Sequence, residues 1–279
     1  MPISYETLSR SGRLGNQLWE IASTYGIACG QLDDPSFPAW DYQPFFSCPD
    51  EWFNGAQGSP ATDFVPHMDP RAKAYLQDYN LFRGVEKQVK AFFRPSEAAK
   101  DVLGGIWAND LYPLLKQLVD GPLISVHIRR GDNVTHPEGF HPLRSWDYYR
   151  SALDLCTPDG EIIVFSDDPD WCEQHFEKET GRTPALFYRG TPRPREYEDR
   201  QLYENAPVLD WIDVCLMAAC NEHVISNSTY AWWGAFLSED PSPIFPSNWF
   251  GWKIKEWTDA SLMFPESWRE VEDPTMGGA

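Results

Sequence analysis

Short apolar runs and longer amphipathic segments alternate along the second half of the chain. The runs are rich in β-branched and aromatic residues, as in buried strands, and the longer segments repeat apolar positions every three or four residues, as in helices. The expected strands are 123–128, 161–165, 185–188, 223–226 and 242–246, and the expected helices are 146–155, 168–179, 208–220 and 228–237. This alternation predicts βαβ crossovers and a parallel sheet whose ligand site lies beyond the carboxyl ends of the strands.

The first 120 residues begin in a similar way. Residues 3–8 alternate as in a strand, SGRLGN provides a glycine turn, and residues 17–28 have a helical period. A second helical pattern covers residues 96–119, although Gly104 and Gly105 interrupt it. The amino-terminal part therefore also predicts strand, turn and helix.

Residues 33–70 have a different composition, rich in Pro, aromatic and small polar residues and without clear periodicity. This composition predicts a long, partly ordered surface region. Loops of this length are often functional, and aromatic rings can stack on the apolar faces of sugars. The alternative is that the aromatic residues pack together as a small satellite core.

Composition and charge narrow the class of protein. The 279 residues are 42% hydrophobic and 15% aromatic, which suffices for one large domain or two smaller ones. The net charge of −19 disfavours nucleic acid and anionic membrane surfaces as partners. No apolar run reaches the roughly 20 residues that cross a bilayer, and the first residues do not have the pattern of a secretion signal, so we expect a cytoplasmic protein without a transmembrane segment.

The cysteines do not indicate a metal site. They include no CxxC pair and no metal-ligand spacing, so we expect most of them to be reduced and buried. Their positions are Cys29, Cys48, Cys156, Cys172, Cys215 and Cys220.

Two adjacent arginines follow the strand expected at 123–128. The sequence LISVHIRRGD places Arg129 and Arg130 at the carboxyl end of that strand. A guanidinium donates two parallel hydrogen bonds and keeps its charge near neutral pH, so this position suits a pyrophosphate. The alternative is an ordinary ion pair between Arg129 and Asp132 that closes a turn.

Two glycines shape the amino-terminal motif SGRLGNQ. Gly12 and Gly15 allow a close approach of the backbone, and the free N–H groups of the helix that follows attract anions. The spacing is neither that of GxGxxG nor that of the Walker loop. The alternative is that the two glycines only form a turn.

Polar residues also follow two later strands. Asp167 and Asp168 come after the strand at 161–165, where a carboxylate can accept hydrogen bonds from guanine or cap the next helix. Asn227, Ser228 and Thr229 follow the strand at 223–226 and begin a helix, an arrangement that suits phosphate but also fits an ordinary N-cap.

Four blocks together resemble the alpha-1,2-fucosyltransferases of glycosyltransferase family 11. They are GRLGNQLWEIASTYGIA, VHIRRGD, FSDDPDWC and ISNSTYAWWGAFL, in the order and spacing of that family. The resemblance implies an α/β protein of GT-B type, with two Rossmann-like domains whose parallel sheets face each other across a cleft. We expect an acceptor-side domain at residues 1–118 and a domain that binds the GDP-sugar at residues 119–279.

The resemblance also implies roles for single residues. Arg129 would bind the pyrophosphate, with His127 and Asp132 shaping its site, and Asp167 or Asp168 would read guanine. The remaining donor-site residues would be Gly12, Arg13, Gly15 and Asn16 from the glycine motif and Asn227, Ser228 and Thr229 at phosphate or ribose.

The implied reaction is the inverting transfer of L-fucose from GDP-β-L-fucose to a galactose-containing oligosaccharide, with an α-1,2 linkage. Arginine and helix-end N–H donors stabilise a departing diphosphate, so no metal or other cofactor is expected. The candidates for a general base are His136, Glu138 and His141. The alternatives are another GDP-sugar transferase, such as a protein O-fucosyltransferase, and a nucleotide-sugar or glycan-binding protein without turnover.

Overall fold

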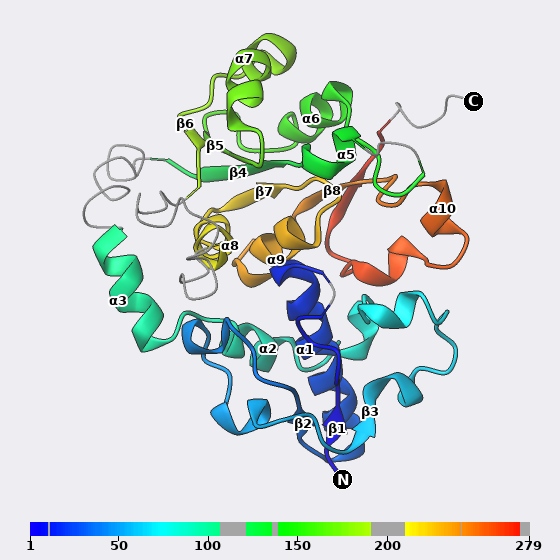
Figure 1. Cartoon of the computed structure of the whole chain (residues 1–279). Helices are drawn as coiled ribbons and strands as arrows, with labels where there is room; N and C mark the ends of the chain where they lie inside the picture. The colour runs from blue at the N-terminus through cyan, green and yellow to red at the C-terminus, as the bar shows by residue number, and fades with distance from the viewer. Residues whose placement is uncertain (11, 107–120, 136–138, 191–209, 241, 274–279) are drawn as a thin grey trace.

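The computed structural model describes residues 1–10, 12–106, 121–135, 139–190, 210–240 and 242–273. These residues form two parallel sheets with helices packed around them, one in each half of the chain (Figure 1). The expected α/β fold with two parallel sheets, the GT-B type, is thereby confirmed. The expected division between residues 118 and 119 falls outside the described residues.

The amino-terminal sheet is small and has the strand order β2-β1-β3. Its strands are β1 (Ile3–Ser4), β2 (Pro35–Ser36) and β3 (Ser59–Pro60). Its helices are α1 (Leu14–Gln31), α2 (Glu86–Phe92) and α3 (Glu97–Ile106), with 3-10 turns η1 (Gln43–Phe45), η2 (Asp50–Phe53), η3 (Ala61–Phe64), η4 (Ala72–Ala74) and η5 (Tyr79–Leu81) between them. The strand expected at 3–8 is therefore only two residues long.

The carboxyl-terminal sheet has the order β6-β5-β4-β7-β8-β9, with every described pair parallel. Its strands are β4 (Leu123–Ile128), β5 (Glu161–Ser166), β6 (Leu186–Tyr188), β7 (Glu222–Val224), β8 (Ile244–Pro246) and β9 (Arg269–Val271). Its helices are α5 (Gly131–Thr135), α6 (Trp146–Leu153), α7 (Pro169–Thr180), α8 (Trp211–Ala218), α9 (Thr229–Leu237) and α10 (Trp252–Lys255), followed by the turn η9 (Ala260–Met263). The expected crossovers are confirmed, while β9, α5 and α10 were not predicted.

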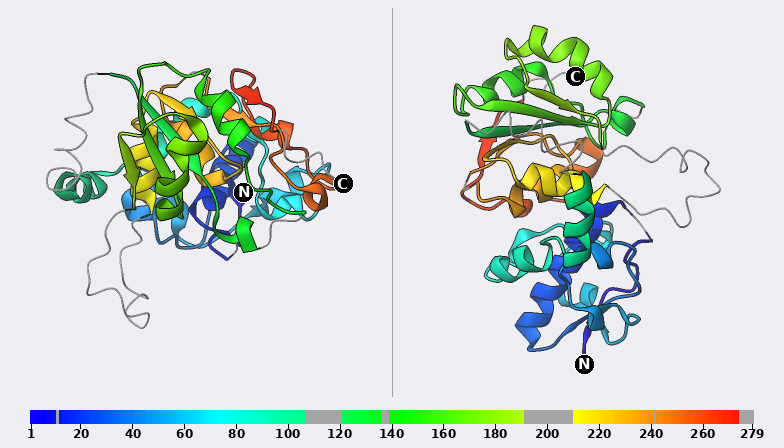
Figure 2. Two further views of the ribbon diagram at one scale, coloured as in Figure 1. Left: turned by 90° about the horizontal axis from the view of Figure 1, so that it is seen from above. Right: turned by 90° about the vertical axis from the view of Figure 1, so that its left-hand side faces the viewer.

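Side chains of the central strand β4 alternate between the two faces of this sheet. Ile124, Val126 and Ile128 pack in one core with residues of α6 and α7. Ser125 and His127 are buried on the other face, where α8 and α9 lie between the two sheets. The two views in Figure 2 show the same layering from other directions. This alternation directs His127 toward the amino-terminal half of the protein.

An aromatic cluster joins the two halves of the molecule. Trp19 of α1 packs on Trp232 and Trp233 of α9, with ring centroids 4.3 and 5.6 Å apart, and on Phe82 at 5.5 Å. Trp19, Trp232 and Trp233 are fully buried. Large apolar rings buried across both halves make one continuous core, so the helices α1 and α9 are held in a fixed relation.

Most aromatic residues of segment 33–70 are also part of this core, so the prediction of a surface region was wrong. Phe37 is fully buried, Phe46 is 2% exposed, and Trp40 stacks on Phe46 with centroids 5.5 Å apart. The Trp40 indole also donates to Gln17 Oε1 at 2.8 Å. Short strands and 3-10 turns turn these rings inward without leaving the period of a helix or a long strand in the sequence.

All six cysteines are free thiols, four of them buried. Among the described residues there is also no helix that combines the length and apolarity needed to span a membrane.

Glu20 of α1 is an acidic residue whose side chain is buried in the protein core. Both carboxyl oxygens of Glu20 are buried without a hydrogen-bond partner, and burial raises the pKa of Glu20 to about 9. The folded protein therefore keeps a proton on Glu20 that the unfolded chain releases near pH 4.5. Because the folded state binds more protons in this range, its stability falls as the pH rises from about 4.5 to about 9.

We expect Glu20→Gln to flatten this pH dependence. In the wild-type protein, Glu20 should lower the free energy of unfolding by up to about 1.4 kcal/mol for each pH unit of increase. The variant has no carboxyl group at this position and should not show this decrease. Urea unfolding at pH 5, 7 and 9 measures the difference. Parallel curves for the two proteins would contradict the assignment of a protonated, buried Glu20.

Candidate active site

A cleft of about 1120 Å³ lies between the two halves of the protein. Its wall is formed by the amino-terminal ends of α1 and α9, the carboxyl ends of β4 and β5, and the segments around η4 and α10. The expected site residues on this wall are Gly12, Arg13, Gly15, Asn16, His127, Arg129, His141, Asp167, Asn227, Ser228 and Thr229. Residues far apart in the sequence thus meet at one site.

Arg129 pairs with a residue of the neighbouring strand. Its Nη1 lies 2.5 Å from Asp167 Oδ2, and its side chain is 16% exposed. Strands β4 and β5 are in register with Ile128 opposite Ser166, so the residues that follow each strand lie side by side. The side chain of Asp132, the alternative partner of Arg129, lies outside the part of the chain that the structure describes.

Arg130 and Asp168 form a second pair away from the cleft wall. Arg130 Nε donates to Asp168 Oδ2 at 2.9 Å, and the guanidinium lies 3.4 Å from the centroid of the Trp171 ring. Asp168 also caps α7 by accepting from the Trp171 N–H at 3.3 Å. Arg130 and Asp168 are therefore held by structural contacts, which leaves Arg129 and Asp167 as the pair that faces the cleft.

His127 is buried at the end of β4. Its Nδ1 lies 2.8 Å from Ser226 Oγ. Burial, opposed by the charge of Asp167, lowers the pKa of His127 to about 4, so the imidazole is neutral at pH 7. A neutral ring in this place adds no positive charge, and it fills the floor of the cleft beside Arg129.

The glycine motif brings α1 into direct contact with α9. A Cβ on Gly15 would lie 2.5 Å from the backbone nitrogen of Tyr230, and the Trp233 indole donates to Gly15 O at 2.9 Å. Gly12 has a φ of +76°, a conformation that favours glycine. The two glycines therefore do more than form a turn, because Gly15 permits the amino-terminal ends of α1 and α9 to touch.

Asn16 connects the same helix ends through its side chain. Its Oδ1 accepts from Thr229 Oγ1 at 2.8 Å and from Gln77 Nε2 at 3.1 Å. Both α1 and α9 begin without an acidic residue in the first turn, so no carboxylate of the helix itself offsets the dipole at either N-terminus. Two helix ends of positive partial charge therefore line the cleft together.

Ser228 occupies the N-cap position of α9, but its side chain makes no capping hydrogen bond. Asn227, by contrast, is committed to the backbone: its Nδ2 donates to Pro142 O at 3.0 Å and to Trp249 O at 3.1 Å. Ser228 therefore has a hydroxyl that is not used as a helix cap, whereas Asn227 holds two loops of the cleft wall.

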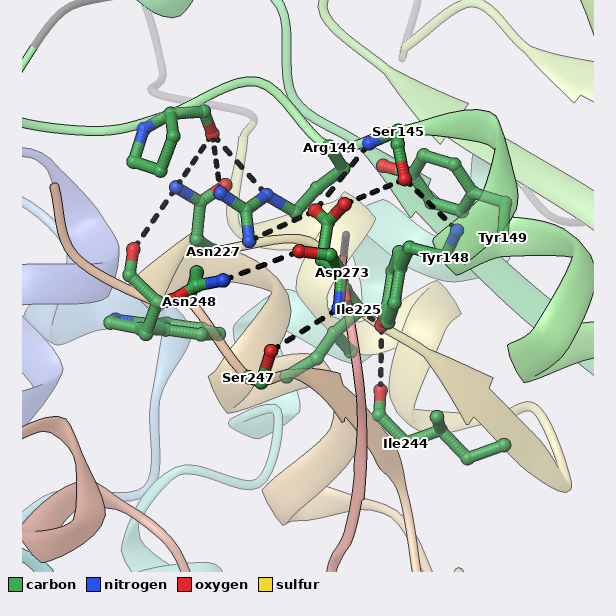
Figure 3. A network of polar contacts seen from close by, with 12 residues as sticks. Arg144, Ser145, Tyr148, Tyr149, Ile225, Asn227, Ile244, Ser247, Asn248 and Asp273 are labelled. Atoms are coloured by element: carbon green, nitrogen blue, oxygen red, sulfur yellow. Dashed lines mark hydrogen bonds and ion pairs between the residues drawn. The ribbon is translucent and has the colours of Figure 1, made fainter. Parts of the chain in front are cut away.

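A buried ion pair holds the loop that carries Pro142 (Figure 3). Arg144 Nη1 lies 3.2 Å from Asp273 Oδ2, and the two side chains are 1% and 0% exposed. Arg144 also donates to Pro142 O, and Ser145 Oγ donates to Asp273 Oδ1 at 2.6 Å. Asn227 Nδ2 donates to the same Pro142 carbonyl. One hydrogen-bond network therefore connects the end of β9, this loop and Asn227.

Of the three candidate bases, His141 is the one that the structure describes. His141 lies on the cleft wall, with its ring 6.0 Å from that of Phe250. His136 and Glu138 lie outside the described residues. Within the residues that the structure does describe, no group of three or more His, Cys, Asp or Glu side chains is placed to hold a metal ion.

Two acidic residues on the cleft wall were missed. Asp210 and Asp213 lie at the start of α8, and Tyr42 donates to Asp210 at 3.0 Å. Burial raises the pKa of Asp213 to about 7, which is unusual for an aspartate. The available signal was the presence of two acids in the otherwise apolar helix expected at 208–220.

Comparison with known proteins identifies the class. Residues 96–256 match glycosyl transferase family 11, and the chain belongs to this family. It is similar to the O-antigen biosynthesis glycosyltransferase WbnK of Escherichia coli, with 32% identity over 70% of this chain and 58% of the relative. It is also 29% identical to an alpha-1,2-colitosyltransferase of Escherichia coli, over 53% of this chain and 47% of the relative.

A more distant relative is the galactoside alpha-(1,2)-fucosyltransferase 2 of Oryctolagus cuniculus, 23% identical over 83% of this chain and 66% of the relative. The chain thus spans about half the length of the two Escherichia coli relatives. Among solved structures, NodZ alpha-1,6-fucosyltransferase soaked with GDP-fucose aligns with a TM-score of 0.46 and 13% identity, over 85% of this chain and 93% of that one.

We expect Gly15→Ala to weaken the contact between α1 and α9. A methyl group 2.5 Å from a backbone nitrogen forces the helices apart, and such overpacking costs about 1–3 kcal/mol. Gly30→Ala in the same helix is the matched control, because a Cβ there meets nothing within 4 Å. Thermal and urea unfolding should show a loss only for Gly15→Ala, and equal stability of the two variants would contradict the close approach.

Proposed function

We infer that this protein transfers L-fucose from GDP-β-L-fucose to a hydroxyl group of a galactose-containing glycan, with inversion and an α-1,2 linkage. Membership in glycosyl transferase family 11 supports glycosyl transfer, and the name of the rabbit relative supports the sugar, the linkage and the acceptor. The observation that carries the proposal is the position of Arg129 on a cleft wall that also contains the amino-terminal ends of α1 and α9.

This arrangement suits a diphosphate leaving group. As the bond between fucose C1 and the β-phosphate oxygen breaks, the electron pair and negative charge move onto GDP. The Arg129 guanidinium and the N–H groups at the start of α9 would receive this charge without rearrangement. The acceptor oxygen would bond to C1 from the face opposite GDP, which converts the β-linked donor into an α-fucoside, and its proton would pass to a base such as His141 or to water.

The proposed donor site uses side chains of the cleft wall. Arg129 would bind the pyrophosphate, with Arg13 and the Ser228 hydroxyl lining the same cleft, and Asp167 would accept hydrogen bonds from guanine. Asp168 is a weaker candidate because it caps α7 and pairs with Arg130. The same proposal keeps the division into an acceptor-side domain at residues 1–118 and a donor domain at residues 119–279.

A second donor sugar is favoured by one specific finding. One Escherichia coli relative is named as a colitosyltransferase, so transfer of a different deoxy sugar is the main competing activity. Both activities require the same binding site for the diphosphate, and they differ in the sugar that the cleft accepts. A comparison of product formation from GDP-fucose and from the GDP derivative of colitose therefore separates them.

The proposal is tested by calorimetric titration with GDP, GDP-fucose, GDP-mannose and UDP-galactose in EDTA, followed by product analysis with lactose as acceptor. We expect binding of GDP and GDP-fucose, weaker binding of the other two, and formation of fucosyl-lactose without added metal. Binding of GDP without any product would contradict the proposed transfer to galactose. Absence of guanine-nucleotide binding would overturn the donor assignment as a whole.

We expect Arg129→Ala to lower kcat/KM at least about 100-fold, because one preorganised donor to the leaving group is lost. Arg129→Lys should recover little, since a point charge does not reproduce the two parallel hydrogen bonds of a guanidinium. The matched control is Arg150→Ala, which removes a half-exposed arginine of α6 away from the cleft. Circular dichroism should show that all three variants fold, and wild-type activity of Arg129→Ala would contradict the assignment.

A further inference from the structure

The wall of the cleft has a second part that the donor assignments do not use. It is formed by residues around η4 in the amino-terminal half and by the segment that follows α10 in the carboxyl-terminal half. The residues that matter for its chemistry are Met68, Asp69, Tyr75, Trp257, Asp259 and Leu262. The volume of about 1120 Å³ exceeds the roughly 300–1000 Å³ that one drug-sized ligand fills, so the cleft has room for a second substrate.

Trp257 is held in a fixed orientation in this part of the cleft. Its half-buried ring packs against the main core, and the Arg71 guanidinium lies 5.0 Å from its centroid. Arg71 is in turn fixed by Asp69, whose two carboxyl oxygens accept from Arg71 Nε at 3.0 Å and NH2 at 3.1 Å. A residue of one half thus positions an aromatic ring of the other half.

A turn of unusual conformation brings Tyr75 to the same wall. Leu76, fully buried, has a φ of +49°, and its carbonyl accepts from Ser23 Oγ of α1 at 2.7 Å. Tyr75 and Gln77 on either side of Leu76 both line the cleft. The anchored turn therefore presents an aromatic and an amide side chain from a position fixed against α1.

The charge of this part of the wall indicates the kind of ligand. Its ionisable side chains include the carboxylates Asp69, Glu256 and Asp259. Arg71 beside Trp257 pairs with Asp69, and the lining cation Lys255 donates to Asn248 at 2.8 Å, so Glu256 and Asp259 supply the negative charge. Carboxylates accept hydrogen bonds from hydroxyl groups and repel anions. Aromatic rings next to such acceptors match a neutral sugar, which has an apolar C–H face and a polar rim of hydroxyl groups.

We propose that Trp257 is the stacking platform for a neutral terminal sugar of the acceptor glycan, and that Tyr75 and Asp259 hydrogen-bond its hydroxyl groups. Asp259 would do so through Oδ2, since its Oδ1 accepts from the Ser261 N–H at 2.9 Å. This inference rests on the proposed transferase function and names the acceptor subsite of the same cleft. The subsite accepts a neutral hexose such as galactose and excludes the same hexose when it carries a carboxylate.

The test compares Trp257→Ala with Trp252→Ala, since Trp252 is 61% exposed on α10 and does not line the cleft. Steady-state kinetics with lactose should show a KM for the acceptor raised roughly tenfold or more in Trp257→Ala, with the affinity for GDP unchanged in calorimetry. Trp257→Phe should restore most of the loss because it keeps a ring, and Trp252→Ala should behave as wild type. A matching galacturonide should be a poor acceptor for the wild-type protein.

The outcomes separate this inference from the proposed function. If Trp257→Ala folds, binds GDP and keeps the wild-type KM for lactose, the subsite is wrong while the transferase assignment stands. An equal rise in the KM for lactose in Trp252→Ala and Trp257→Ala, or efficient use of the galacturonide, would also overturn the proposed subsite. If wild-type protein neither binds GDP nor forms product, the proposed function fails before the subsite is tested.

Discussion

The contact between the amino-terminal ends of α1 and α9 is the constraint on which the site depends. Gly15 has no side chain, so the backbone of α9 can lie where a Cβ would otherwise be, and the Trp233 indole closes the contact by donating to Gly15 O. Trp19 and Trp232 extend the contact into the core. A rigid, buried joint between the two halves places both helix ends on one wall of the cleft, so their partial charges act on the same ligand.

The register of the carboxyl-terminal sheet supplies the side chains that complete this wall. Because Ile128 lies opposite Ser166, the arginines after β4 meet the aspartates after β5. One of these pairs, Arg130 with Asp168, is tied to α7, while Arg129 and Asp167 face the cleft. Asp167 offsets the charge of Arg129, and a bound diphosphate would compete with Asp167 for the same guanidinium.

Much of this arrangement could be predicted from local sequence. The bounds of β4 follow from a short run rich in Ile and Val, and the motif residues were placed at strand and helix ends, where they lie. The partner of Arg129 could not be predicted, because it depends on strand register. Residues 33–70 were misread because 3-10 turns bury aromatic rings without a detectable period. Asp213 was missed because its raised pKa arises from burial in the folded protein, and the only local signal was a pair of acids in an apolar helix.

The central claim is that GDP binds where Arg129 meets the start of α9, and a crystal structure with GDP tests it most directly. We predict diphosphate oxygens within hydrogen-bonding distance of the Arg129 guanidinium and of the N–H groups of the first turn of α9. Arg129 should then share or leave its contact with Asp167. GDP bound elsewhere, with the pair of Arg129 and Asp167 unchanged, would contradict the account.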